Sequence, residues 1–177
     1  RRWSTQLQPE TIFIGGGTHS ILPVTDMRRL PTATGSADEF TIECNPATVD
    51  SEKAALYREL GVNRISLGVQ SFDRAVLAKL GRRHSPEEGE RAVRGAAAAI
   101  GNASVDLVYG ARRSSVEIAR EDAARAVAAG AAHVSAYALT LDPAVLAEDV
   151  PLARMRRQGR LPLPSDDEVR AQADAVR

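Results

Sequence analysis

The sequence predicts an α/β fold in which parallel strands alternate with helices. Two observations predict it: short apolar segments rich in β-branched residues recur along the chain, and segments with helix-start and helix-end signals lie between them. The expected strands are Thr11–Ile14, Phe40–Cys44, Arg64–Val69, Val105–Tyr109 and His133–Leu139. We interpret them as continuous apolar runs rather than strict alternations, which is typical of parallel strands covered on both faces. A doubly wound sheet and an incomplete (β/α) barrel both fit this order.

The helices expected in the first half of the chain are marked at both ends. Asp50 follows the second strand and can cap a helix that runs to Gly61. The capping box Ser85-Pro86-Glu87-Glu88 has proline at the first helical position, and its helix should end at Gly101. These helices supply the crossovers that parallel strands require.

Two more helices are expected in the second half. Ser114-Ser115-Val116-Glu117 has the same capping-box form, and Gly130 suits the position just after the end of that helix. Leu161-Pro162-Leu163-Pro164 reads as a surface loop. A last helix follows over roughly Asp166–Arg177, and its acidic start suits the positive end of a helix dipole.

Charge and composition narrow the classes of function. The 177 residues carry 23 basic and 23 acidic side chains, so no global field attracts nucleic acid or an anionic membrane. No apolar run reaches membrane-spanning length, and we expect a cytoplasmic protein. Cys44 is the only cysteine, which excludes an intrachain disulfide. His19, His84 and His133 share no spacing that suits a metal, so no metal ligand is expected in this chain.

Glycines and polar residues gather where the expected strands end. They are Gly15–Thr18 after the first strand, Glu43–Pro46 at the second, Gly68–Ser71 at the third, Asp106 with Tyr109 and Gly110 at the fourth, and Tyr137 with Thr140 at the fifth. In parallel α/β sheets the ligand sits at the carboxyl ends of the strands. The sequence therefore predicts a binding site at this rim.

The residue types at the rim indicate the kind of ligand. Glycines let a ligand touch backbone groups, and Glu43 and Asp106 suit ribose hydroxyls or an ammonium. Gln70 both donates and accepts hydrogen bonds, and Arg82 can form a fork on a carboxylate. The glycine run lacks the pattern of a P-loop and of a dinucleotide fingerprint. Each feature alone also suits a turn or a helix cap, so the prediction of a zwitterionic, ribose-bearing ligand depends on their joint placement.

Five segments together carry a resemblance to a known family. They are Ile14–Thr18, Glu43–Pro46, Arg64–Phe72, Asp106–Gly110 and Ser135–Tyr137. In this order they resemble the radical S-adenosylmethionine (SAM) proteins of the oxygen-independent coproporphyrinogen III oxidase-like family. Gly68–Phe72, Leu80–Arg82 with His84-Ser85, and Ser135–Thr140 look more like its haem chaperone branch than like its oxidase branch.

The resemblance implies part of an incomplete TIM-like (β/α)6 barrel. Residues 1–160 would form a partial barrel core that lacks the first β/α unit, and residues 161–177 would begin a C-terminal extension. The residues implied in SAM binding are Gly16, Gly17 and Thr18 at the methionine end of SAM, and Glu43, Gln70, Arg82 and Asp106 at the family's other SAM-contacting positions.

The resemblance also implies a [4Fe-4S] cluster that reduces SAM to a 5′-deoxyadenosyl radical. In the family the cluster is held by a CxxxCxxC loop upstream of the glycine run. Residues 1–10 contain no cysteine, and Cys44 alone cannot hold a cluster. We therefore expect this chain to be a fragment of a family member and inactive alone. His19 stands where the family usually has proline, and Ala111–Ser115 replaces its usual Leu-Pro-Gly-Gln-Thr.

Four functions remain open at this point. By the resemblance, the parent protein binds SAM and a cluster and is either a haem chaperone that passes haem to an acceptor protein, or an oxidase that decarboxylates porphyrinogen propionates. A third possibility is a binding module that keeps the SAM or haem surface without the cluster. An unrelated (β/α) enzyme with a nucleotide-like ligand at the same rim also fits. We expect the first, with SAM and haem or porphyrinogen as ligands.

Overall fold

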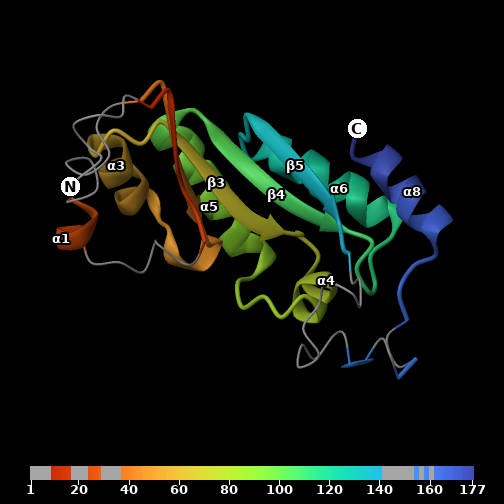
Figure 1. The fold of residues 1–177 in the computed structure, drawn as a ribbon. Helices are drawn as coiled ribbons and strands as arrows, with labels where there is room; N and C mark the ends of the chain where they lie inside the picture. Colours follow the sequence, from red (N-terminus) through yellow and green to blue (C-terminus); the bar gives the residue numbers. More distant parts are fainter. Residues whose placement is uncertain (1–8, 17–23, 29–36, 141–153, 156–157, 160–161) are drawn as a thin grey trace.

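The computed structural model describes residues 9–16, 24–28, 37–140, 154–155, 158–159 and 162–177. Within them, five parallel strands form one sheet in the order β1-β2-β3-β4-β5 (Figure 1). The strands are β1 Thr11–Ile14, β2 Glu39–Cys44, β3 Arg64–Gln70, β4 Ala103–Tyr109 and β5 His133–Ala138. All five strands expected from the sequence are confirmed, with ends that differ by at most two residues.

The strand order decides between the two architectures that the sequence left open. Each strand pairs in parallel with the next strand in the sequence. A doubly wound sheet instead reverses its order at a switch point. The described sheet therefore has the winding of a partial (β/α) barrel, as expected.

The helical elements of the described residues are α1 Val24–Met27, the 3-10 turn η2 Pro46–Thr48, α3 Ser51–Glu59, α4 Arg74–Lys79, α5 Pro86–Ile100, α6 Val116–Ala128 and α8 Asp166–Ala175. Of these, α5 and α6 cover one face of the sheet (Figure 1). Helix α5 packs against β3 and β4 and also against α3, while α6 packs against β4, β5 and α8. The core lies between these helices and the sheet, where Tyr57, Ile65 and Val93 are fully buried.

Most of the expected helix boundaries are confirmed. The Asp50 side chain accepts a hydrogen bond from the Lys53 backbone N–H and caps α3. At α5, Ser85 and Glu88 form the reciprocal capping box, and Gly101 closes the helix in the left-handed conformation with a φ of 80°. The sequence signals at these helix ends therefore act locally, as we expected.

The start of α6 corrects the sequence interpretation by one residue. Its N-cap is Ser115, whose hydroxyl accepts from the Ile118 N–H, so Glu117 falls one position short of the place a capping box requires. The Ser114 hydroxyl is used elsewhere: it donates to the Ala111 carbonyl and lies 2.8 Å from the Gln172 side-chain oxygen of α8. A tertiary contact thus removes Ser114 from the cap.

The strands also differ from the expected continuous apolar runs. Phe40, Ile42 and Cys44 of β2 belong to the core under the helices, whereas the alternate positions are polar: Glu39 and Glu43 are partly buried and Thr41 is fully buried. Successive side chains of a strand point to opposite faces, so the apolar residues occupy the helix-covered face and the polar ones the other. The expectation of two apolar faces was wrong because only one face of this sheet carries helices.

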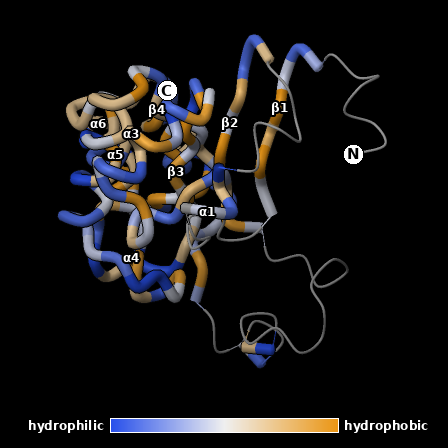
Figure 2. Tube along the Cα trace, turned by 90° about the vertical axis from the view of Figure 1, so that its left-hand side faces the viewer, coloured by the Kyte–Doolittle hydropathy of each residue, from blue (hydrophilic) through white to orange (hydrophobic). Residues whose placement is uncertain are grey.

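Strand β1 forms one edge of the described sheet and lies far from α5 and α6 (Figure 2). The side chain of Phe13 is 60% exposed there. No helix in the described part of the chain has the length and apolar character needed to span a bilayer.

Candidate functional site

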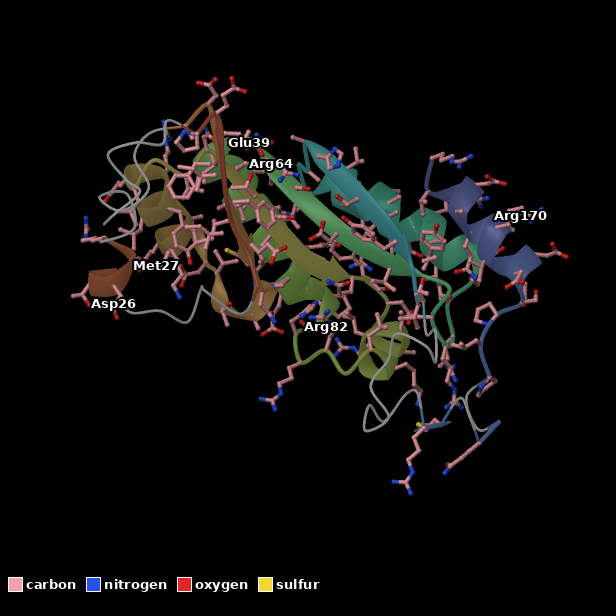
Figure 3. The ribbon with its side chains drawn as sticks, viewed as in Figure 1. Asp26, Met27, Glu39, Arg64, Arg82 and Arg170 are labelled. Atoms are coloured by element: carbon pink, nitrogen blue, oxygen red, sulfur yellow. The ribbon has the colours of Figure 1, made fainter. Side chains whose placement is uncertain are left out.

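A cavity of about 210 Å³ opens at the carboxyl ends of β2, β3 and β4. Its walls are formed by Glu43, Cys44, Asn45, Ser66, Gly68, Gln70, Arg82 and Asp106. Four of the residues singled out in the sequence, Glu43, Gln70, Arg82 and Asp106, therefore meet in one place. Arg82 lies at this end of the sheet. Glu39 and Arg64, the first residues of β2 and β3, lie at the other end (Figure 3).

The backbone of Gly16 contacts Glu43, one of the residues that line the cavity. Its N–H donates to a carboxylate oxygen of Glu43 across 3.2 Å, with the backbone at a φ of 81°. A Cβ at Gly15 would lie 2.9 Å from the same oxygen. The absence of a side chain at Gly15 thus leaves room for the Glu43 carboxylate. Gly17 and Thr18 lie outside the described residues.

The Asp106 carboxylate faces the cavity from β4. It accepts a hydrogen bond of 3.1 Å from the Ser66 hydroxyl, and Ser135 pairs with it in the sheet register. Partial burial raises the pKa of Asp106, hydrogen bonds from both serines oppose this, and the nearby Glu43 raises the pKa further. The site therefore holds two neighbouring carboxylates, which favours a cationic or hydroxyl-rich ligand group.

Gln70 has an unusual backbone at the end of β3. Its φ is 71°, and the N–H of Ser71 donates to the Val69 carbonyl across 2.9 Å, which closes a γ-turn around Gln70. The pairing register of β3 with β4 shifts between Leu67 and Gln70. The turn directs the Gln70 side chain back over Gly68: its amide nitrogen lies only 2.9 Å from the place a Cβ on Gly68 would occupy.

Two other residues at this end of the sheet have structural roles. Cys44 is 5% exposed, and burial raises the pKa of its thiol to about 12, so it is the buried apolar residue that the sequence suggested. His84 is also buried, with Nε2 3.0 Å from the Val69 carbonyl, and burial lowers its pKa. In the described part of the chain, His, Cys, Asp and Glu side chains form no group of three that could hold a metal ion.

Sequence reasoning missed Ser66 and Ser135 and placed Tyr137 and Thr140 at the rim. The two serines occupy the same face as Asp106, and an alternation of small polar with apolar residues in β3 and β5 was the available signal. Tyr137 is 57% exposed, and the cavity walls do not include it or Thr140.

The family comparison covers most of the chain. The profile of the Radical SAM superfamily matches residues 2–127. Among curated proteins, the haem chaperone HemW of Escherichia coli is 40% identical over 146 residues, which are 77% of this chain and 38% of that protein. HemW of Lactococcus lactis is 35% identical over 89% of this chain and 42% of its own length. HemW of Mycobacterium tuberculosis is 37% identical over 89% of this chain and 41% of its own length.

Two solved structures share the fold. Coproporphyrinogen III oxidase (HemN) from Escherichia coli has a TM-score of 0.74 and 20% identity, over 93% of this chain and 38% of that one. Elp3 from the archaeon Methanocaldococcus infernus has a TM-score of 0.73 and 18% identity, over 95% of this chain and 44% of that one. The chain thus spans less than half the length of the relatives it matches.

Proposed function

Because this chain belongs to the radical SAM superfamily, we propose that the cavity at the carboxyl ends of β2, β3 and β4 binds part of an S-adenosylmethionine molecule. The observation that carries the proposal is the convergence of Glu43, Gln70, Arg82 and Asp106 on one cavity wall. Its volume of about 210 Å³ is below the ~300–1,000 Å³ of typical ligand pockets, so these residues hold only a portion of the ligand.

The donors and acceptors on the wall suit the groups that SAM carries. The carboxylates of Glu43 and Asp106 fit ribose hydroxyls or the ammonium of the methionine moiety. The guanidinium of Arg82 fits a carboxylate, and the Gln70 amide provides both a donor and an acceptor. We assign Gly16, and with it Gly17 and Thr18, to the methionine end of SAM.

The residues of this chain do not fit the family's iron–sulfur cluster. Thiolates hold such clusters, and the sequence contains Cys44 alone. Its side chain is buried, and burial raises the pKa of the thiol to about 12, which disfavours the thiolate that a metal requires.

For the parent protein we propose a haem chaperone-like role in the cytoplasm, with haem or porphyrinogen and a haem-acceptor protein as partners. The support is the identity of 35–40% to three proteins named haem chaperone HemW. The oxygen-independent oxidase remains the second candidate, since the likeness to HemN, at 20% identity, shows the fold alone.

Calorimetric titration of the chain with SAM tests the proposed site. We expect measurable binding that Glu43→Gln and Asp106→Asn each weaken by about tenfold or more, because a hydrogen bond to a charged group contributes roughly 1.5–3 kcal/mol. The matched control is Glu39→Gln, which removes a carboxylate from the opposite end of β2. Equal SAM affinity in all four proteins would refute the assignment of the site.

A haem titration tests the second part separately. A Soret shift that saturates at one haem per chain would place a haem contact on this chain. An unchanged Soret band would remove haem from the ligands of this chain while leaving the SAM result as it stands.

A further inference from the structure

The backbone around Gln70 is held in a conformation that a side chain rarely adopts. A γ-turn of positive φ is strained, and such strain persists only where the surroundings enforce it. The Val69 carbonyl on one side of the turn accepts from the Ser71 N–H and lies 3.0 Å from His84 Nε2, which must carry the proton to donate there. The contacts on the other side of the turn come from α6.

Asp122 of α6 accepts hydrogen bonds from Ser71 and Phe72, the two residues that follow Gln70. One carboxylate oxygen accepts a 2.6 Å hydrogen bond from the Ser71 hydroxyl, and the other accepts a 2.7 Å hydrogen bond from the Phe72 N–H. Asp122 is only 5% exposed and does not line the cavity at the carboxyl ends of the strands. A buried carboxylate with two such donors fixes both of them in place.

Arg125, one helical turn further along α6, holds the same segment. Its guanidinium donates to the Phe72 carbonyl across 3.0 Å and lies 5.0 Å above the Phe72 ring. It also pairs with Glu90 of α5 at 2.7 Å, which ties α6 to α5. Both polar groups of the Phe72 backbone are thus bound by α6, directly after the strained turn.

We propose that Asp122 is a positioning residue of the binding cavity: by holding Ser71 and Phe72, it keeps Gln70 in the γ-turn that directs its amide over Gly68. The consequence for ligand binding rests on the proposed SAM site, whereas the consequence for the backbone of Gln70 does not. Removal of Asp122 lets the turn relax toward negative φ, and the amide leaves the cavity wall.

A double-mutant cycle with a nuclear magnetic resonance readout tests this. The proteins are the 177-residue chain and its Gln70→Ala, Asp122→Ala and doubly substituted variants. We expect Gln70→Ala to weaken SAM binding by about fivefold, as for the loss of one neutral hydrogen bond, and Asp122→Ala to weaken it by a similar factor. The double variant should bind no more weakly than Gln70→Ala, because Asp122 acts through Gln70.

A separate measurement reports the conformation of Gln70. A positive φ produces a strong Overhauser effect between the amide proton and the α-proton of the same residue, so this signal shows whether the turn is kept. We expect Asp122→Ala to lose it and Asp122→Asn to keep it, since asparagine still accepts from the Phe72 N–H. Arg120→Ala, at an exposed position on α6, is the control and should keep it. If Asp122→Ala fails to fold, Ser71→Ala, which removes one of the two donors, carries the same expectation.

The two proposals fail in different ways. A folded Asp122→Ala protein that keeps the Overhauser effect of Gln70 overturns the positioning role, whatever it does to SAM. If Asp122→Ala and Gln70→Ala have fully additive effects on SAM affinity, action through Gln70 is overturned. If no protein in the set binds SAM, the proposed function fails, and the Overhauser effect still decides the role of Asp122.

Discussion

Gly68 shows how a missing side chain shapes the cavity wall. A Cβ at this position would lie 2.9 Å from the amide nitrogen of Gln70, so alanine would push that amide away. We expect Gly68→Ala to lower SAM affinity by about fivefold, as for the loss of one hydrogen bond. In the Gln70→Ala background the same substitution should have no effect, because nothing remains to collide. An equal loss in both backgrounds would contradict this, and titration calorimetry measures it.

Asp122 also predicts how stability depends on pH. Burial raises its pKa from an ordinary 3.8 to about 6, so between these values the folded chain holds more protons on Asp122 than the unfolded chain does. This contribution to stability is present at low pH and is lost as pH rises through about 6. Melting curves of the wild type and Asp122→Asn should therefore separate, with the wild type gaining relative stability from pH 7 to pH 4. Parallel curves would contradict the raised pKa.

At the scale of single elements, local signals predicted most helix ends but not the contacts between helices. Asp50 and the Ser85 capping box act within a few residues of their own helices, so the sequence contains all that determines them. Ser114 does not: its hydroxyl contacts Gln172 of α8, 58 residues further on. The same limit applies to Gln70, whose place at the rim was predicted but whose strained turn depends on contacts with α6.

The buried side chain of Gln172 connects helix α8 to the loop after β4. The Gln172 oxygen accepts from the Gly110 N–H at 2.9 Å and lies 2.8 Å from the Ser114 hydroxyl oxygen, and the residue is 1% exposed. Gln172→Ala leaves the Gly110 N–H unpaired, which costs about 1–3 kcal/mol. We expect Tm to fall by roughly 2–4 °C per kcal/mol for a chain of this size. Asp174→Ala, on the exposed side of α8, is the control and should leave Tm unchanged.

For the whole molecule, the sequence predicted a parallel α/β sheet but not which face of it is polar. The sequence interpretation treats Phe40–Cys44 as a continuous apolar run, although Thr41 and Glu43 alternate with its apolar residues. Periodicity gives the two faces of a strand, but only the pairing of each strand with the next shows that the helices lie on one side. The open face then becomes the one that carries the cavity at the strand ends.

The cavity residues keep their places without the thiolates that an iron–sulfur cluster requires, and this leads to a prediction for the chain as a whole. Glu43, Gln70 and Asp106 come from three strands that the described sheet holds together, and none of them depends on a cluster for its place. We therefore expect SAM titrations to give the same affinity before and after anaerobic incubation with ferrous iron and sulfide. Absorption spectra should show no iron–sulfur band in the wild type or in Cys44→Ala. A stoichiometric band that requires Cys44 would contradict this, because it would mean that a thiol buried in the core reaches the metal.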